Sequence, residues 1–327
     1  MLQPAELKLD LPVELSNGAM SSTSMLWKIL LASKEGDLDT IRKLAGDCPE
    51  LIYGQYNYTP PIHLAVREGH VSTVKYLLDN GAYDPRYKTY PFQDSLLAIA
   101  NERGHHEIKA LLNEYGADSS RQKYRGDNGK ILYPRSELQQ EFERAVEQRN
   151  IERVSQLLKT SPDLIKDETY FWGEGILLFA VKENNRPMID LLTRYGAKVP
   201  VLLKWTQFYY FEHDDGAAYI MKKGMNPNTM SWHHVTILHD MAQKGNISKA
   251  ELLLNYGAEI DPIDEEYQST PLGMAARWGH IEMARYLLKK GANPNKAGAS
   301  WATPLEWAKL ICYDDIEAVL RNAGATN

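Results

Sequence analysis

A cluster of residues that could bind a metal or take part in acid–base catalysis lies in the segment TMSWHHVTILHDMAQKGN, residues 229–246. It contains His233, His234, His239 and Asp240 within eight positions. Neutral imidazole and carboxylate are, together with thiolate, the usual ligands of zinc. The segment therefore encodes either one metal or hydrolytic site, or several residues with separate structural and binding roles. The choice depends on the elements that position these side chains.

The composition bounds the class of protein. A chain of 327 residues with 43% apolar and 24% charged residues is typical of a soluble protein with one large or two ordinary domains and a buried core. The net charge of -6 gives no global reason to bind nucleic acid or an anionic membrane, so neither partner is expected. Cys48 and Cys312 lie near opposite ends of the sequence, which predicts two buried thiols and no disulfide framework.

Residues 1–24 are expected to form an N-terminal arm. They contain Glu6, Asp10 and Glu14 where an export signal would need an apolar core, and no apolar run of the chain approaches the ~18 residues of a membrane span. Cytoplasmic residence is therefore expected. The alternating apolar residues from Leu7 to Leu15 have the period of a strand, although an extended arm along the next element is equally consistent.

An internal repeat organises most of the chain. Residues 270–292 read TPLGMAARWGHIEMARYLLKKGA and residues 303–325 read TPLEWAKLICYDDIEAVLRNAGA, so equivalent positions are 33 residues apart. The same frame fits residues 60–82 and 236–258. These four segments resemble the ankyrin repeat, whose TPLH-x-A motif and 33-residue period are both present. The resemblance implies an all-α solenoid of about nine helix-turn-helix repeats joined by hairpin connections, called fingers below.

The residue types within one repeat explain where its two helices begin and end. Thr270 can cap the first helix, and Pro271 suits its first position, where a missing N–H costs nothing. Gly279 marks the turn between two amphipathic helices, and Gly291 ends the second helix in a left-handed conformation. One such pair cannot bury its own apolar face, so neighbours must stack into a solenoid with a concave surface.

Weaker copies of the repeat extend over roughly residues 25–325 and define the expected domains. Residues 25–118 form a first sub-array of about three repeats, and residues 139–327 form a second of about six, with a degenerate copy at 198–225. In that copy Phe208 replaces a small alanine, which should widen the gap between neighbouring helices. Residues 119–138 are expected to be either a spacer or a basic contact element that uses the side chains of Arg121, Lys123, Arg125 and Lys130.

The fingers carry an unusual number of aromatic residues. Fingers of the resembling family are mainly polar, whereas large amphipathic rings on loops are typical of recognition surfaces. We expect the following residues to line one binding groove, although several rings could instead fold back onto neighbouring repeats: Tyr56, Tyr58, Tyr90, Phe92, Phe171, Trp172, Trp232, His233, His234, Tyr267 and Trp301. On this hypothesis, alanine at Tyr56, Trp172 or Trp232 leaves stability nearly unchanged while it abolishes binding.

Catalysis has little support in the sequence. Phosphate-binding, dinucleotide-binding, zinc-protease and serine-hydrolase motifs are absent, and His213, Asp214 and Asp215 fall at an expected inter-helix turn. No catalytic residue, metal or cofactor is predicted. The expected function is therefore a non-catalytic scaffold for a protein or peptide; the alternative is a solenoid that binds a small molecule or carbohydrate, with or without enzymatic activity. The partner and the oligomeric state are not encoded in any of these patterns.

The repeat frame divides the first cluster between two roles. Thr236 to His239 occupies the TPLH position, so His239 matches His63, and the resemblance implies that His239 hydrogen-bonds the backbone of its connection and of the next repeat. Asp240 falls at an exposed or inter-repeat position of the following helix. Only Trp232 to His234 lie on a finger and stay candidates for binding.

Overall fold

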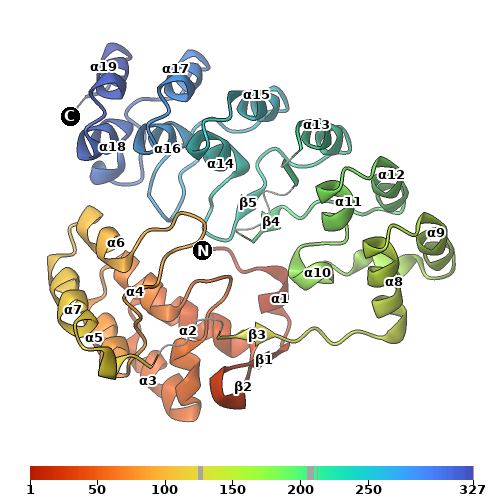
Figure 1. The fold of residues 1–327 in the computed structure, drawn as a ribbon, viewed down its shortest axis with the longest axis horizontal. Coiled ribbons are helices and arrows are strands. Elements are labelled where there is room, and N and C mark those ends of the chain that lie inside the picture. Colours follow the sequence, from red (N-terminus) through yellow and green to blue (C-terminus); the bar gives the residue numbers. More distant parts are fainter. Residues whose placement is uncertain (124–127, 205–209, 212, 327) are drawn as a thin grey trace. The chain divides into compact units, whose positions relative to one another are not determined.

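The computed structural model describes residues 1–123, 128–204, 210–211 and 213–326, and most of these residues are helical (Figure 1). The predicted all-α fold class is confirmed. The chain divides into two compact units, Gln3–Pro134 and Met1–Leu2 with Arg135–Asn327. This division falls within the segment 119–138. Arg125 and Phe208, on which two of the expectations above depend, lie outside the described residues.

Helix pairs follow one another in the unit Gln3–Pro134. The pairs are α2 (Thr23–Glu35) with α3 (Leu38–Asp47), α4 (Pro61–Glu68) with α5 (Val71–Asp79), and α6 (Leu96–Glu102) with α7 (His106–Gly116); the short helix α1 (Ala5–Lys8) and the 3₁₀ turns η1 (Ser16–Gly18), η2 (Pro49–Tyr53) and η3 (Ser119–Arg121) complete the helical elements. Helix α2 contacts α4, and α4 contacts α6. The first helix of each pair thus stacks on the first helix of the next.

A small antiparallel sheet joins the N-terminal arm to the end of the segment 119–138. Its order is β2-β1-β3, formed by β2 (Met20–Ser22), β1 (Pro12–Glu14) and β3 (Lys130–Ile131). Val13 lies opposite both Ser21 and Ile131 and is buried. The strand predicted between Leu7 and Leu15 therefore covers only part of that run, because α1 and the residues after it take up its beginning.

The basic residues of the segment 119–138 contact their own unit where the structure describes them. Arg121 pairs with Asp118 at 3.2 Å, and its guanidinium lies 4.9 Å from the centre of the Tyr115 ring. The Lys123 backbone N–H donates to the carbonyl of Gly81. These contacts favour a structural role for this stretch.

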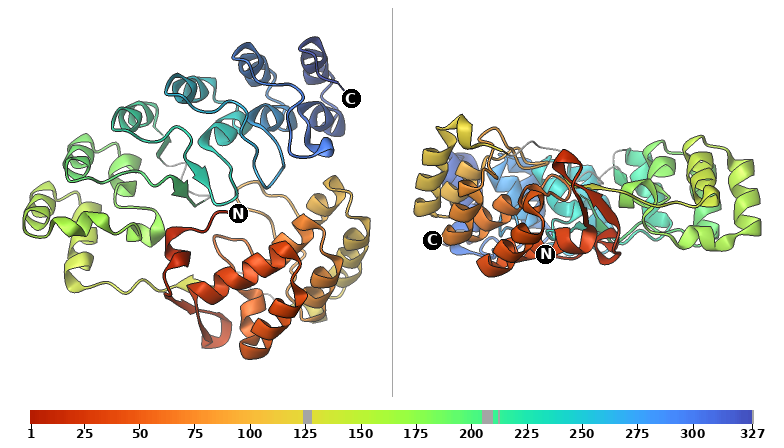
Figure 2. Two further views of the ribbon diagram at one scale, coloured as in Figure 1. Left: turned by 180° about the vertical axis from the view of Figure 1, so that it is seen from behind. Right: turned by 90° about the horizontal axis from the view of Figure 1, so that it is seen from below.

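The unit that contains residues 135–327 continues the stacking of helices. Its helices are α8 (Glu137–Glu147), α9 (Ile151–Thr160), α10 (Tyr170–Gly173), α11 (Leu178–Lys182), α12 (Arg186–Arg194), α13 (Asp214–Lys222), α14 (Ile237–Gln243), α15 (Ile247–Asn255), α16 (Pro271–Arg277), α17 (Ile281–Lys289), α18 (Pro304–Ile311) and α19 (Asp314–Asn322), with 3₁₀ turns η4 (Pro162–Lys166) and η6 (Ser300–Ala302). Helix α16 contacts both α14 and α18, and α17 contacts α19; the labels in Figure 1 and the left view of Figure 2 show this succession of helices. A parallel pair of short strands, β4 (Leu202–Leu203) and β5 (Met230–Ser231), links two neighbouring fingers.

The helix starts and ends follow the sequence pattern. The Thr270 and Thr303 side chains accept hydrogen bonds from the backbone N–H groups of Gly273 and Glu306, at 3.3 and 3.2 Å, and a proline occupies the next position in each case. Gly279 has a φ of 77°, the left-handed conformation that glycine adopts at least cost. The predicted caps and turns are confirmed.

A histidine at the turn between the two helices of a repeat connects it to the repeat before. His280 Nε2 donates to the carbonyl of Gln243 at 2.7 Å, and His70 Nε2 donates in the same way to Lys34. The His280 ring lies so close to Gly245 that a Cβ atom there would come within 2.8 Å of His280 Nδ1. Gly245, with a φ of 64°, is therefore required both by the turn and by its neighbour.

His239 is fully buried and connects its finger to the next one. Its Nδ1 accepts from the Thr236 backbone N–H at 3.1 Å, and its Nε2 donates to the Ser269 carbonyl at 3.2 Å. The structural role predicted for His239 is confirmed. Burial lowers the pKa of His239 from about 6.5 to about 4, so the ring stays neutral at neutral pH.

The neutral state of His239 predicts a loss of stability in acid. Between pH 6.5 and 4 the unfolded chain protonates this ring and the folded chain does not. The free energy of unfolding of the wild type relative to His239→Gln should therefore fall as the pH falls through this window, by at most about 1.4 kcal/mol per pH unit. Urea unfolding at several pH values measures this difference. His106→Gln, at an exposed histidine, is the control, and parallel profiles for wild type and His239→Gln would contradict the assignment.

Candidate functional site

The finger residues predicted to bind a partner divide into a buried and an exposed set. At most 4% of the surface is exposed for each of the following: Tyr56, Phe171, Trp232, His233 and Tyr267. The remaining six are half-buried or exposed: Tyr58, Tyr90, Phe92, Trp172, His234 and Trp301. The expectation that these side chains lie on a surface is therefore corrected for the five buried residues. A large ring on a short connection removes more apolar area from water when it packs on neighbouring residues than when it projects into solvent.

In the unit Gln3–Pro134, tyrosines of two successive fingers form a partly exposed aromatic cluster. The rings of Tyr58 and Tyr90 lie 5.0 Å apart between centroids, and Tyr58 is 47% exposed. The Tyr87 hydroxyl donates to the Tyr58 carbonyl and accepts from Nδ1 of His63, each at 2.9 Å. His63, in the same repeat position as His239, thus holds a finger tyrosine. Tyr56 is different, because its hydroxyl donates to the carboxylate of Glu6 in the interior.

Two of the three histidines of the segment 229–246 contact carboxylates of the next finger. His233 Nδ1 lies 3.3 Å from the Glu266 carboxylate, and both side chains are buried. His234 Nδ1 lies 3.1 Å from the carboxylate of Glu265, whose backbone N–H donates to the His233 carbonyl. These contacts join two adjacent fingers side by side.

The same segment does not assemble a metal site in the part of the chain that the structure describes. No group of three or more histidine, cysteine or acidic side chains there could hold a metal ion. The carboxylate of Asp240 is buried, which raises its pKa, and accepts from Lys244 Nζ at 2.7 Å. His239 faces the backbone, as described above. The residues of the first cluster are therefore divided among separate contacts.

Tyr267 belongs to an aromatic group around a largely buried arginine. The Arg277 guanidinium lies 4.8 Å from the centre of the Tyr267 ring and 4.6 Å from that of Trp307. Trp301 packs edge-on against Trp307 at 5.7 Å, at the rim of this group. Sequence reasoning missed the role of Arg277, although arginine among aromatic residues at helical spacing is a signal for such cation–π packing.

The finger that contains α10 presents one large ring to solvent. Trp172 is 62% exposed, whereas Phe171 beside it is buried and packs against Phe179 at 4.6 Å between ring centroids. Phe171 and Trp172 have φ values of 49° and 62°. Left-handed backbone costs about 1–3 kcal/mol for each residue with a side chain, and it persists only where the surroundings impose it.

Two side chains from outside this finger stabilise its conformation. The Phe171 N–H donates to the carboxylate of Glu143, and Arg135 donates to the Thr169 carbonyl at 2.6 Å and to the Asp167 carboxylate at 2.6 Å. The Arg135 side chain is only 9% exposed. The exposed position of Trp172 is thus held by a charge-assisted network around the nearly buried side chain of Arg135, on a finger that we call the Trp172 finger (residues 169–176).

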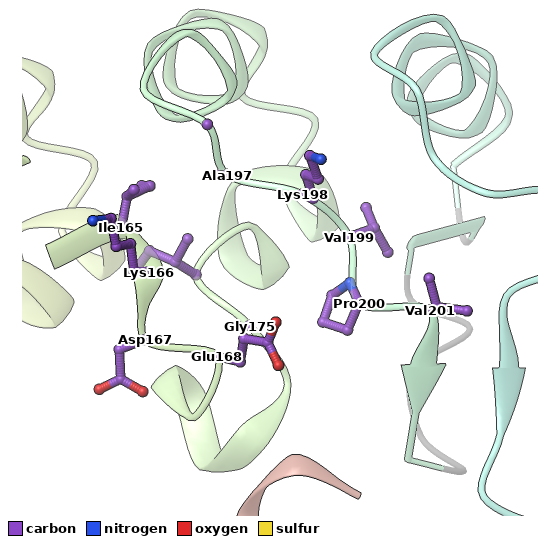
Figure 3. A pocket seen from close by; sticks show the side chains of 12 residues that line it. Ile165, Lys166, Asp167, Glu168, Gly175, Ala197, Lys198, Val199, Pro200 and Val201 are labelled. Carbon is purple, nitrogen blue, oxygen red and sulfur yellow. The ribbon is translucent and has the colours of Figure 1, made fainter. Parts of the chain in front are cut away.

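A cavity of about 400 Å³ lies beside the Trp172 finger (Figure 3). Its walls are the connections 165–168 and 196–201, with Gly175 and Ile176 at the end of the finger. Apolar side chains line most of it, namely Ile165, Ile176, Ala197, Val199, Pro200 and Val201, and the charged residues are Lys166, Asp167, Glu168 and Lys198. Ligand sites combine such apolar walls with a few polar groups. The only signal of this cavity in the sequence is the departure from the repeat at KVPV, which begins at Lys198.

The two cysteines of the chain are free thiols. Cys48 and Cys312 form no disulfide. Cys48 is half-buried and Cys312 is exposed, which corrects the expectation of two buried thiols. Cys312 follows α18 in a left-handed conformation, at a turn where other repeats have glycine. Among the described residues, we find no helix with the length and apolar character needed to cross a membrane.

A model of the ankyrin-repeat family, described as ankyrin repeats in three copies, matches residues 29–123 and 207–297, together more than half of the chain. The chain belongs to the ankyrin-repeat family. Relatives include the human transient receptor potential cation channel subfamily A member 1, which is 22% identical over an alignment that covers 90% of this chain and 26% of that protein. A putative ankyrin repeat protein of fowlpox virus is 25% identical over 56% of the chain and 29% of its own length.

Other relatives of this ankyrin-repeat chain carry the names of enzymes. The Arabidopsis thaliana E3 ubiquitin-protein ligase XBAT32 is 26% identical over 63% of the chain and 38% of its own length. The chain therefore spans only about a quarter to two fifths of the length of these three relatives. Ankyrin repeats are themselves non-catalytic and indicate a scaffold for interactions between proteins.

The different exposure of two tryptophans predicts different effects of their removal. Trp232→Ala should lower the free energy of unfolding by about 3–5 kcal/mol, because it empties a fully buried site. Trp172→Ala should change it by no more than about 0.5 kcal/mol, because its indole faces solvent. Urea unfolding of the two variants measures both values. Equal destabilisation would show that Trp172 packs in a core.

Proposed function

We propose that this ankyrin-repeat chain is a non-catalytic scaffold that binds a protein or peptide through the exposed aromatic residues of its fingers. The residues are Tyr58, Tyr90, Phe92, Trp172, His234 and Trp301, each within its own unit. Family membership supports the general role of a protein scaffold. The five buried finger residues are not part of the proposed contact.

The observation that carries the proposal is the exposure of Trp172 on a finger whose conformation is imposed. An indole that is 62% exposed loses favourable burial, and the left-handed backbone of Phe171 and of Trp172 itself adds strain. Arg135 and Glu143 compensate for that strain without covering the ring. A rigid, exposed tryptophan is suited to anchor a partner, because few rotamers are lost when it is covered.

The cavity beside the Trp172 finger favours a second candidate, a solenoid that binds a small molecule or a carbohydrate. Its volume of about 400 Å³ lies within the range of small-molecule sites. The polypeptide partner is preferred because exposed rings occur on fingers of both units, whereas the cavity is confined to one of them. Cytoplasmic residence is part of the proposal, and the two cysteines without a disulfide fit a reducing compartment.

Affinity purification tests the scaffold. The immobilised chain is exposed to an extract of its native host with brief cross-linking, and retained proteins are quantified by mass spectrometry. A polypeptide retained by the wild type should be reduced about tenfold or more with Trp172→Ala, as expected for removal of an anchor residue. Tyr256→Ala, at an exposed ring on the end of α15, is the matched control and should retain it fully.

The alternative function gives a different result. If no polypeptide is retained and a compound of a small-molecule library raises the melting temperature of the chain, the scaffold hypothesis is wrong and the small-molecule hypothesis replaces it. Retention that is equal for wild type and Trp172→Ala would place the contact on another surface.

A further inference from the structure

The cavity beside the Trp172 finger has the chemistry to select one kind of side chain. We infer that it receives a lysine or arginine side chain of the partner polypeptide, with the aliphatic part on the apolar wall and the cation at Glu168. This inference rests on the proposed scaffold function and assigns it a specificity site.

The walls of the cavity suit the aliphatic part of such a side chain. Figure 3 shows Ile165 on one connection and Pro200 on the other, on opposite sides of the cavity. Ile176 and Val199 are 4% and 7% exposed, so they form fixed apolar surfaces. Long basic side chains place their methylene groups on surfaces of this kind while the charged end stays near a polar group.

The charges of the cavity leave one carboxylate available. Asp167 already accepts from Arg135 at 2.6 Å, and Lys166 pairs with Asp163 at 2.6 Å. Glu168 is exposed and has no ion-pair partner among the residues that the structure describes. Its side chain lies beside Gly175, on the cavity side of the connection (Figure 3). A cation in the cavity would therefore meet an uncompensated carboxylate.

The other available charge sharpens the test. Lys198 stands on the opposite connection and also has no ion-pair partner in the described part of the chain. It repels a bound cation and would attract a bound carboxylate. The net charge of -6 favours the approach of basic partners over acidic ones. Removal of the Glu168 charge should therefore weaken the binding of a basic side chain, whereas removal of the Lys198 charge should not.

Trp172 supplies a contact surface next to this cavity. Its finger ends at Gly175 and Ile176, which line the cavity, and Lys204 Nζ donates to the Trp172 carbonyl from the connection that continues the opposite wall. A polypeptide that places a basic side chain in the cavity can pack its neighbouring residues on the exposed indole. This arrangement places the strained backbone and exposed ring of the Trp172 finger directly after the connection that carries the carboxylate of Glu168.

The experiment uses a phage library of random dodecapeptides selected on the complete chain. Selected peptides should be enriched in lysine or arginine next to apolar residues. By fluorescence anisotropy, Glu168→Gln should weaken their binding about threefold to tenfold, the range of a partly enclosed charge pair. Lys198→Gln should leave the affinity equal or increase it. Replacement of the basic peptide residue by methionine should remove the effect of Glu168→Gln, which a double-mutant cycle measures.

Three results would overturn the inference. They are unchanged binding to Glu168→Gln, weakened binding to Lys198→Gln with acidic peptides selected, and the absence of any selectable peptide. The proposed scaffold function is tested separately. If Tyr58→Ala abolishes the binding of selected peptides and Glu168→Gln does not, the scaffold function is supported and the site for a basic side chain is wrong. If neither a peptide nor a protein of the host is retained, both fail.

Discussion

Every feature of this structure depends on the stacking of apolar helix faces between neighbouring repeats. Helix α16 packs on α14 and on α18, so its apolar residues are buried only because both neighbours are present. The threonine caps begin the first helix of a repeat, and the glycine turns separate it from the second. His239 and His280 then supply the hydrogen bonds that fix one repeat to the next.

Because the helices are used for stacking between repeats, the side chains that differ most in chemistry from repeat to repeat lie in the fingers. These connections have no repeating backbone partner, so each one is stabilised in its own way. His233 and Glu266 join two fingers through buried side chains, whereas Arg135 holds a finger through its backbone carbonyl. The outcome is a set of differently stabilised loops, one of which, the Trp172 finger, has its largest ring exposed to solvent.

The sequence predicts the helices far better than it predicts the fingers. Thr270, Gly279 and His239 occupy periodic positions, and a period determines which face of a helix is buried. Phe171 and Trp172 are adjacent and chemically similar, yet one is buried and the other exposed. Their fates follow from left-handed backbone angles and from Glu143, 28 positions before Phe171, and no local pattern contains that information. The cavity likewise arises between two connections about thirty residues apart.

The contact between a glycine turn and a ring of the next repeat bears on how the chain could change its length. His280 lies against Gly245, and Tyr313 lies in the same way against Gly279. Each junction thus needs only a small residue on one side and an aromatic ring on the other, and two different rings meet this need. Loss or gain of a complete repeat would bring a ring of this kind against another such glycine. The number of repeats can therefore change while every remaining junction stays complementary, whereas the cavity beside the Trp172 finger, formed between the connections 165–168 and 196–201, requires that these neighbouring repeats are kept together.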